Sequence, residues 1–235
     1  KIGITGLNGY TYTLLALDSG GYDIPASSSY TKEGIISSIL SYQLPNGAFA
    51  LDKNAPPDSD MTAIAITALA PYMDESRVKK AVDAAVSYLS KAQQPDGGFL
   101  PSYSSEEVSE STAQVIIALS SIGINPKTDT RFIKNGKSAV DALLSFRTSN
   151  GAFEHTRGGG ADYVATEQSV LALCAYRSLL KSSSHVFDLT GIKSEDATTI
   201  KVKNPETGGN EPFAAAAAVV SVSLLALLLR RKKCE

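Results

Sequence analysis

The side chains that could do chemistry in this chain stand beside three short turns that contain glycine. Carboxylates, phenols, an imidazole and an amide follow these turns or begin the apolar segments after them. This mixture suits a polar ligand with an apolar body, because a few polar groups can then orient a largely apolar molecule. An ordinary solvated loop surface is the alternative, since loops are polar for their own reasons. The candidate ligand-binding residues are Asn46, Asp58, Asp60, Tyr103, Glu110, Glu154, His155 and Tyr163.

The composition gives little support for metal or nucleic-acid chemistry. The histidines are His155 and His185, and the cysteines are Cys174 and Cys234. A catalytic zinc site needs about three well-placed protein ligands, so no metal site is predicted. The 22 basic residues against 24 acidic ones give a formal net charge of −2, which offers no reason to expect nucleic-acid binding.

An internal repeat supplies the elements that must position these residues. Three segments share one order: a turn glycine, a phenylalanine two residues later, and further on a threonine that opens an apolar run. Both markers recur with the same spacings of 50 and 54 residues, which indicates stacked supersecondary units. The markers are Gly47, Gly97 and Gly151, with Thr62, Thr112 and Thr166.

Each repeat is predicted to form two helices. The segment 77–89 has apolar residues at helical spacing and charged residues between them, as an outer amphipathic helix would. The segment 62–70 and its copies are apolar on almost every side and should be buried on most faces. An inner layer of buried helices within an outer layer is an α/α barrel. We expect inner helices near 8–18, 60–73, 109–122 and 163–181, and outer ones near 32–44, 76–93 and 130–147.

The turn at Gln93–Phe99 resembles the repeat of the squalene–hopene cyclase and protein prenyltransferase α/α toroid, a fold shared with transcobalamin and intrinsic factor. The resemblance covers residues 8–181 and implies an all-α domain at 1–181, a partial α/α toroid of helical-hairpin repeats. Seven helices are too few to close a ring, so we expect the C-terminal part of a larger barrel. The likeness to corrinoid-binding barrels implies that a cobalamin-like ligand is compatible with the fold, although no residue specifies one.

The segment Asp58–Ala63 resembles the Asp-x-Asp-Asp-Thr-Ala motif of class II terpene cyclases. The resemblance implies that Asp60 is the general acid that protonates an alkene or epoxide. Met61 departs from the motif, whose acidity depends on a hydrogen-bonded carboxyl network. The alternative is that Asp60 caps the inner helix. Glu110 and Val164 occupy the equivalent position, and a position that accepts valine favours the cap, so no catalytic residue is predicted.

The C-terminal region, after a linker at 182–203, predicts a sorting signal at 204–235. Residues 213–229 are 17 uncharged residues, a helix of roughly 25 Å against a hydrocarbon core of ~30 Å, and four basic residues follow. Together with the residues upstream, this order resembles the cell-wall sorting signal of Gram-positive surface proteins. The resemblance implies that a sortase cleaves after the threonine and transfers it to peptidoglycan; an ordinary turn before a permanent membrane anchor is the alternative. The motif is Asn204, Pro205, Glu206, Thr207 and Gly208.

Three functions are compatible with these patterns. The favoured expectation is a cell-wall-anchored extracellular protein whose toroid domain binds a corrinoid, another small molecule or a partner without catalysis. The alternatives are a terpene-cyclase-like enzyme with Asp60 as general acid, and a structural stalk that displays an upstream domain. The expected partners are a sortase, peptidoglycan, the membrane and a small-molecule ligand.

Overall fold

The computed structural model describes residues 2–183 and 185–191. The chain divides into a unit at Lys1–Asp188 and a second at Leu189–Glu235, and every helix and strand below belongs to the first. Across the described ranges, no helix has the length and apolar character needed to cross a membrane. The predicted sorting motif at 204–208 and membrane helix at 213–229 lie outside these ranges.

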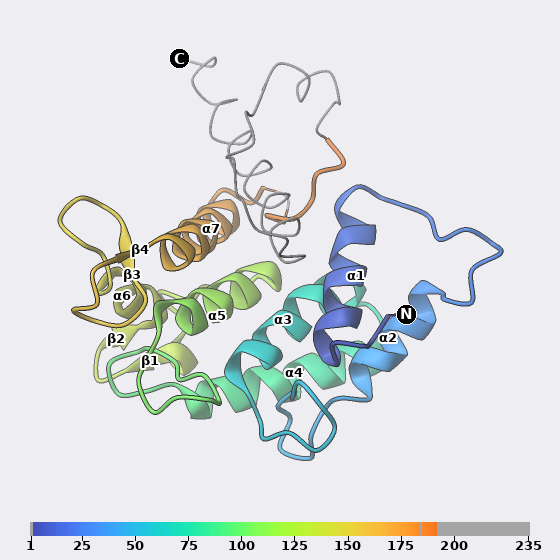
Figure 1. The fold of residues 1–235 in the computed structure, drawn as a ribbon, viewed down its shortest axis with the longest axis horizontal. Helices are drawn as coiled ribbons and strands as arrows, with labels where there is room; N and C mark the ends of the chain where they lie inside the picture. The colour runs from blue at the N-terminus through green and yellow to red at the C-terminus, as the bar shows by residue number, and fades with distance from the viewer. Residues whose placement is uncertain (1, 184, 192–235) are drawn as a thin grey trace, which may run out of the picture. The chain divides into compact units, whose positions relative to one another are not determined.

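Seven α-helices alternate between an inner and an outer layer within residues 2–183. The inner helices pack side by side in chain order, each outer helix packs on the inner helix before it, and Figure 1 shows the inner set following one another across the molecule. This arrangement confirms the predicted α/α-toroid architecture. The inner helices are α1 (Leu7–Ser19), α3 (Ser59–Leu69), α5 (Ser109–Ser121) and α7 (Tyr163–Leu180); the outer ones are α2 (Lys32–Leu40), α4 (Ser76–Ala92) and α6 (Ala139–Leu144).

One hydrogen bond, made in all three repeats, fixes each turn to the inner helix that follows. The backbone N–H of Phe99 donates to the hydroxyl oxygen of Thr112 at 3.1 Å. The corresponding bonds in the first and third repeats are both 2.9 Å long. Phe99 is fully buried as a result, and so are its counterparts in the other repeats. The three phenylalanines that mark the repeat in the sequence thus take equivalent buried positions after tight turns.

The turn glycines allow the turns to pack closely against the outer layer. Gly97 has φ 93°, and a Cβ atom there would lie 2.5 Å from the carbonyl oxygen of Ser138. Gly47 has φ 89°, and a Cβ there would lie 2.6 Å from the carbonyl oxygen of Ala84. An L side chain is disfavoured at such φ values, and here it would also collide with backbone.

The third repeat departs from the predicted helical pattern. A single outer helix was expected over 130–147, but the chain forms a 3-10 turn at Thr130–Phe132, a β-ladder and then the short α6. In the ladder, β1 (Ile133–Lys134) pairs antiparallel with β2 (Lys137–Ser138). Asn135 and Gly136 between them have φ 48° and 75°, as a two-residue hairpin turn requires. The helical expectation was wrong here because this Asn-Gly turn interrupts the helix.

Two further short elements complete the fold. The strands β3 (Phe153–Glu154) and β4 (Ala161–Asp162) form a second antiparallel ladder, which ends directly at α7. The inner helix α3 ends at Leu69 instead of residue 73, because a 3-10 turn containing Pro71 follows it.

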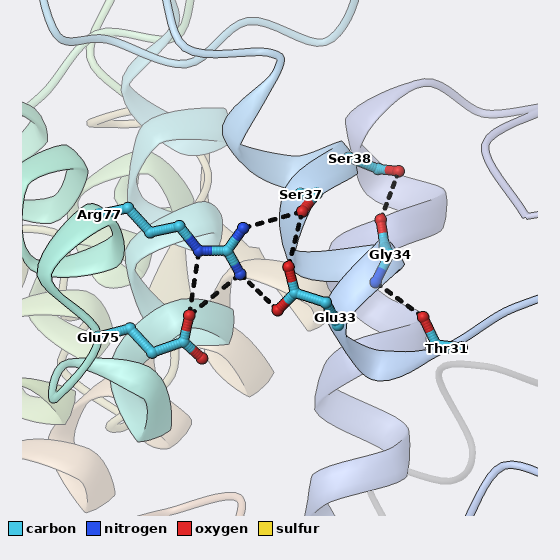
Figure 2. A network of polar contacts seen from close by, with 7 residues as sticks. All are labelled: Thr31, Glu33, Gly34, Ser37, Ser38, Glu75 and Arg77. Carbon is cyan, nitrogen blue, oxygen red and sulfur yellow. Dashed lines mark hydrogen bonds and ion pairs between the residues drawn. The ribbon is translucent and has the colours of Figure 1, made fainter.

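A polar network links two neighbouring outer helices (Figure 2). The guanidinium of Arg77 on α4 donates to Glu33 and Ser37 of α2, at 2.5 and 3.0 Å, and to Glu75 at 3.0 Å. Its exposed ion pairs add little stability, because water screens them. They connect α2 and α4 at the surface.

Candidate functional site

The first turn of α3 holds two of the predicted carboxylates, and they differ in role. Asp58 has extended backbone, with φ −136° and ψ 132°, and its carboxylate accepts the Met61 N–H at 2.8 Å. Its other oxygen accepts the N–H of Ser102 at 3.2 Å. Asp58 is therefore the N-cap of α3, and both of its oxygens have backbone partners.

Asp60 lies two residues further along, already inside the first helical turn. The expectation that it caps α3 is wrong. A capping side chain folds back from a residue with extended backbone onto N–H groups ahead of it, and Asp58 holds that place. Asp60 is consequently free of the helix backbone.

The surroundings of Asp60 favour a protonated carboxyl. Its Oδ1 atom is buried and has no hydrogen-bond partner in the structure. Burial raises the pKa of Asp60 to about 7; the Ser111 hydroxyl opposes this shift, and the charges of Asp58 and Glu110 add to it. Since Ser111 Oγ is itself buried without a hydrogen-bond partner, the two groups are near each other without forming a well-aligned bond. A carboxyl with a pKa near the working pH can both hold and release a proton.

Two tyrosines lie in the electrostatic neighbourhood of this carboxyl. The pKa of Tyr12 on α1 is raised by burial of its hydroxyl and then by the charge of Asp60. The pKa of Tyr103, on the loop before α5, is raised by partial burial and then by Asp60, Glu110 and Asp58. As whole residues, Tyr12 and Tyr103 are nevertheless 54% and 74% exposed. An aromatic face within about 6 Å stabilises a cation, so these rings could serve a cationic species formed beside Asp60.

Glu110 and His155 form a hydrogen-bonded pair next to the same carboxyl. Glu110 begins α5 at the position that Asp60 has in α3, and its two oxygens lie 2.9 and 3.0 Å from Nδ1 of His155. The backbone holds the histidine in place, because the N–H of Ser109 donates to the His155 carbonyl at 3.0 Å. The Glu110 side chain is mostly buried, whereas His155 is about half exposed. The pair thus extends from the interior to solvent.

The structure brings together five of the eight predicted residues and gives the other three separate surroundings. Asn46 accepts the N–H of Ala48 at 3.1 Å, within its own turn. Glu154 accepts the N–H of Gly158 at 2.8 Å and so shapes the glycine-rich loop between β3 and β4. Tyr163 is the first residue of α7 and is 74% exposed. A ligand-binding role for these eight residues stays a prediction.

Sequence reasoning missed two residues near Asp60, namely Tyr12 and Ser111. The repeat contained a signal for them. Asn8, Asp60 and Glu110 are each the second residue of an inner helix. Tyr12 lies four residues after Asn8 and Ser111 lies one residue after Glu110, so the starts of the inner helices indicated both residues. Asn8 Oδ1 is also buried without a hydrogen-bond partner. Polar side chains therefore take the same position at the starts of three adjacent inner helices.

Metal ligands do not assemble in the part of the chain that the structure describes. No group of three or more His, Cys, Asp or Glu side chains there could hold a metal ion. No observation tests the cobalamin-like ligand.

Comparison with known proteins identifies the family of the chain. A family model described as the prenyltransferase alpha-alpha toroid domain matches residues 7–190. The chain is 28% identical over 138 residues to a drimenyl diphosphate synthase from Streptantibioticus cattleyicolor, and 26% identical over 136 residues to one from Streptomyces showdoensis. Each match covers 57% of this chain, but the chain spans only 25% of either relative.

These matches correct the expected function. A domain that binds a ligand without catalysis was favoured, and that expectation is wrong, because both similar proteins are named as synthases and the toroid model is that of a prenyltransferase domain. The comparisons favour the alternative, a terpene-cyclase-like enzyme. The preference for a non-enzyme depended on treating Asp60 as a cap, and the structure assigns the cap to Asp58.

Proposed function

This chain belongs to the prenyltransferase α/α-toroid family, and from that premise we propose that it provides the proton-donating site of a terpene-cyclase-type enzyme, with Asp60 as the general acid. The two similar synthases are named for a product that carries a diphosphate, which favours a polyprenyl diphosphate as the substrate class. The proposal concerns the full-length protein.

One observation supports this function above the others. Asp60 has a buried oxygen without a hydrogen-bond partner, on a carboxyl whose pKa burial raises to about 7. A buried acid without a structural partner is costly, so such a group is expected to have a functional role. Asp58, two residues away, has two backbone partners and serves structure instead.

The O–H bond of Asp60 breaks as its proton forms a C–H bond with the π electrons of an alkene, which leaves a carbocation on the substrate and a carboxylate on Asp60. A second alkene of the same chain supplies the electrons that close a ring. Loss of a proton from the final cation restores the charge of the substrate, and Asp60 regains a proton from solvent.

The neighbouring groups suit this chemistry. The exposed faces of Tyr12 and Tyr103 could stabilise the cation, because aromatic rings attract positive charge through their π faces. The charges of Asp58 and Glu110 keep the proton on Asp60 until an alkene approaches.

The first prediction tests the acid directly. Asp60→Asn in the full-length protein should reduce cyclisation of a polyprenyl diphosphate by at least about 10²-fold, because an amide cannot donate the proton. The melting temperature should not fall, since Asp60 does not cap α3. Product formation by mass spectrometry and thermal unfolding would measure the two quantities.

Glu106→Gln is the matched control, because Glu106 is an exposed carboxylate on the loop before α5. It should keep full activity. Undiminished cyclisation by the Asp60→Asn protein would refute the proposed role.

We also propose that residues 204–235 act as a cell-wall sorting signal, so that the enzyme is displayed outside the cell. The order of Pro205, Thr207, Gly208, the apolar run and the basic tail supports this location. Attachment to the wall is compatible with catalysis, since it concerns a separate part of the chain.

A further inference from the structure

Asp60 has no carboxyl partner on its own helix. Met61 follows it directly, where the resembling motif has a second aspartate. Asp58 is committed elsewhere, because its oxygens accept the N–H groups of Met61 and Ser102. Whatever pairs with the Asp60 carboxyl must therefore come from a neighbouring element.

The adjacent inner helix α5 provides a hydroxyl at this place. Ser111 lies in the first turn of α5, which packs against α3, and it is fully buried. Its Oγ atom has no hydrogen-bond partner, and neither has Oδ1 of Asp60. Two buried polar atoms on packed helices thus lack partners while one can donate and the other accept.

We propose that Ser111 is a positioning residue that donates its hydroxyl proton to the carboxyl of Asp60 and takes the place of the aspartate that Met61 replaces. The inference rests on the proposed function and deepens it. A hydroxyl bound to one carboxyl oxygen would aim the other oxygen, with its proton, at the alkene. It would also stabilise the carboxylate left after proton transfer.

The charged groups around Asp60 do not stabilise its carboxylate, so that stabilisation must come from the Ser111 hydroxyl. Asp58 on the N-terminal side of α3 and Glu110 on α5 are negative and oppose ionisation. The phenols that respond to these charges are Tyr12 on α1, Tyr103 on the loop before α5, and Tyr88 on α4. His155 is paired with Glu110. Among these neighbours, the Ser111 hydroxyl is the group that lowers the pKa of Asp60.

The test compares Ser111→Ala with the wild type in the full-length protein. Activity that needs a protonated acid falls as pH rises through the pKa of that acid. Loss of the hydroxyl should move the midpoint of this fall upward by about 1 pH unit and reduce kcat at low pH by about tenfold, because the acid becomes weaker. Ser111→Thr keeps a hydroxyl and should restore both values.

A second measurement needs no substrate. Infrared titration of the Asp60 carboxyl band, assigned by its absence in Asp60→Asn, should show the same upward move in Ser111→Ala. The matched control is Ser169→Ala, since Ser169 on α7 is also fully buried with an unpartnered Oγ. It should change neither the titration nor the pH profile.

The outcomes separate this inference from the proposed function. If Asp60→Asn is inactive while Ser111→Ala leaves the profile and the titration unmoved, Ser111 has no such role and the function stands. If Asp60→Asn remains active, the proposed function fails, and the positioning role fails with it.

Discussion

At the scale of single residues, the proposed chemistry depends on the contrast between Asp58 and Asp60. They are two positions apart and chemically identical, yet one is bound by backbone N–H groups and the other has a buried oxygen with no partner. The difference arises from backbone conformation at Asp58, which is extended and turns its side chain toward the helix end.

The raised pKa of Asp60 also predicts how stability depends on pH. Its pKa is about 7 in the folded protein against an ordinary value of 3.8, so the folded state binds the proton more tightly than the unfolded state does. The contribution of Asp60 to the free energy of unfolding should therefore be highest below about pH 4 and fall between about pH 4 and 7. Above that range it should level off, after a total loss of at most a few kcal/mol.

Urea unfolding of wild type and Asp60→Asn across this range would measure the effect. The asparagine variant should become more stable relative to wild type as pH rises. A relative loss of stability would mean that the aspartate is better accommodated ionised, in conflict with its burial.

At the scale of elements, each repeat contains a turn whose backbone N–H donates a hydrogen bond to the inner helix that follows. The threonine that accepts this N–H is buried in the first two repeats, which makes the bond costly to break. This contact aligns the starts of α3, α5 and α7 with the turns before them, so Asp60 and Glu110 take equivalent positions in their helices.

Gly97 and Gly123 distinguish two costs of adding a side chain, namely backbone strain at positive φ and collision with neighbouring atoms. Gly97 has φ 93° and a Cβ would meet the Ser138 carbonyl oxygen at 2.5 Å, whereas Gly123 has φ 78° with nothing within 4 Å. Gly123→Ala should cost about 1 kcal/mol from backbone strain alone. Gly97→Ala should cost distinctly more, because a backbone oxygen must also move.

Urea unfolding of both variants under one condition would give the two free energies. Equal losses would show that φ alone governs the turn and that the close approach to Ser138 is soft.

At the scale of the whole molecule, the chain combines a toroid with a C-terminal region of different composition. The family model covers residues 7–190, and the sorting-signal pattern begins at Asn204. The two proposed functions are independent of each other, because the proposed catalysis needs packed inner helices and the proposed sorting needs a short accessible peptide.

The sorting hypothesis predicts a change of fraction in the cell. Thr207→Ala should leave the protein in the membrane fraction, and muramidase should no longer release it, because the acyl group for transfer to peptidoglycan is altered at the cleavage site. Immunoblots of cell-wall and membrane fractions would measure this. Wild-type protein that detergent extracts fully, and muramidase never releases, would identify residues 213–229 as a permanent anchor instead.

The sequence by itself determined the architecture. The spacing of Gly47, Gly97 and Gly151 and of their threonines predicted stacked helix pairs, and the structure places the three phenylalanines in equivalent buried positions. This was possible because a repeat encodes mostly local information: a turn needs glycine, and a buried helix needs an apolar run. The helix over 130–147 was predicted wrongly because an Asn-Gly hairpin within it overrides the outer-helix pattern.

Only the tertiary structure decided what the carboxylates do. Asp60 is not the cap of α3, because the helix begins at Ser59 and Asp58 therefore holds the capping position. The pKa of Asp60 is raised because neighbouring helices exclude water from it. Ser111 is 51 positions away in sequence and meets Asp60 only because α5 packs on α3. Desolvation and the identity of a hydrogen-bond partner depend on which elements pack together, and no local pattern in the sequence contains that information.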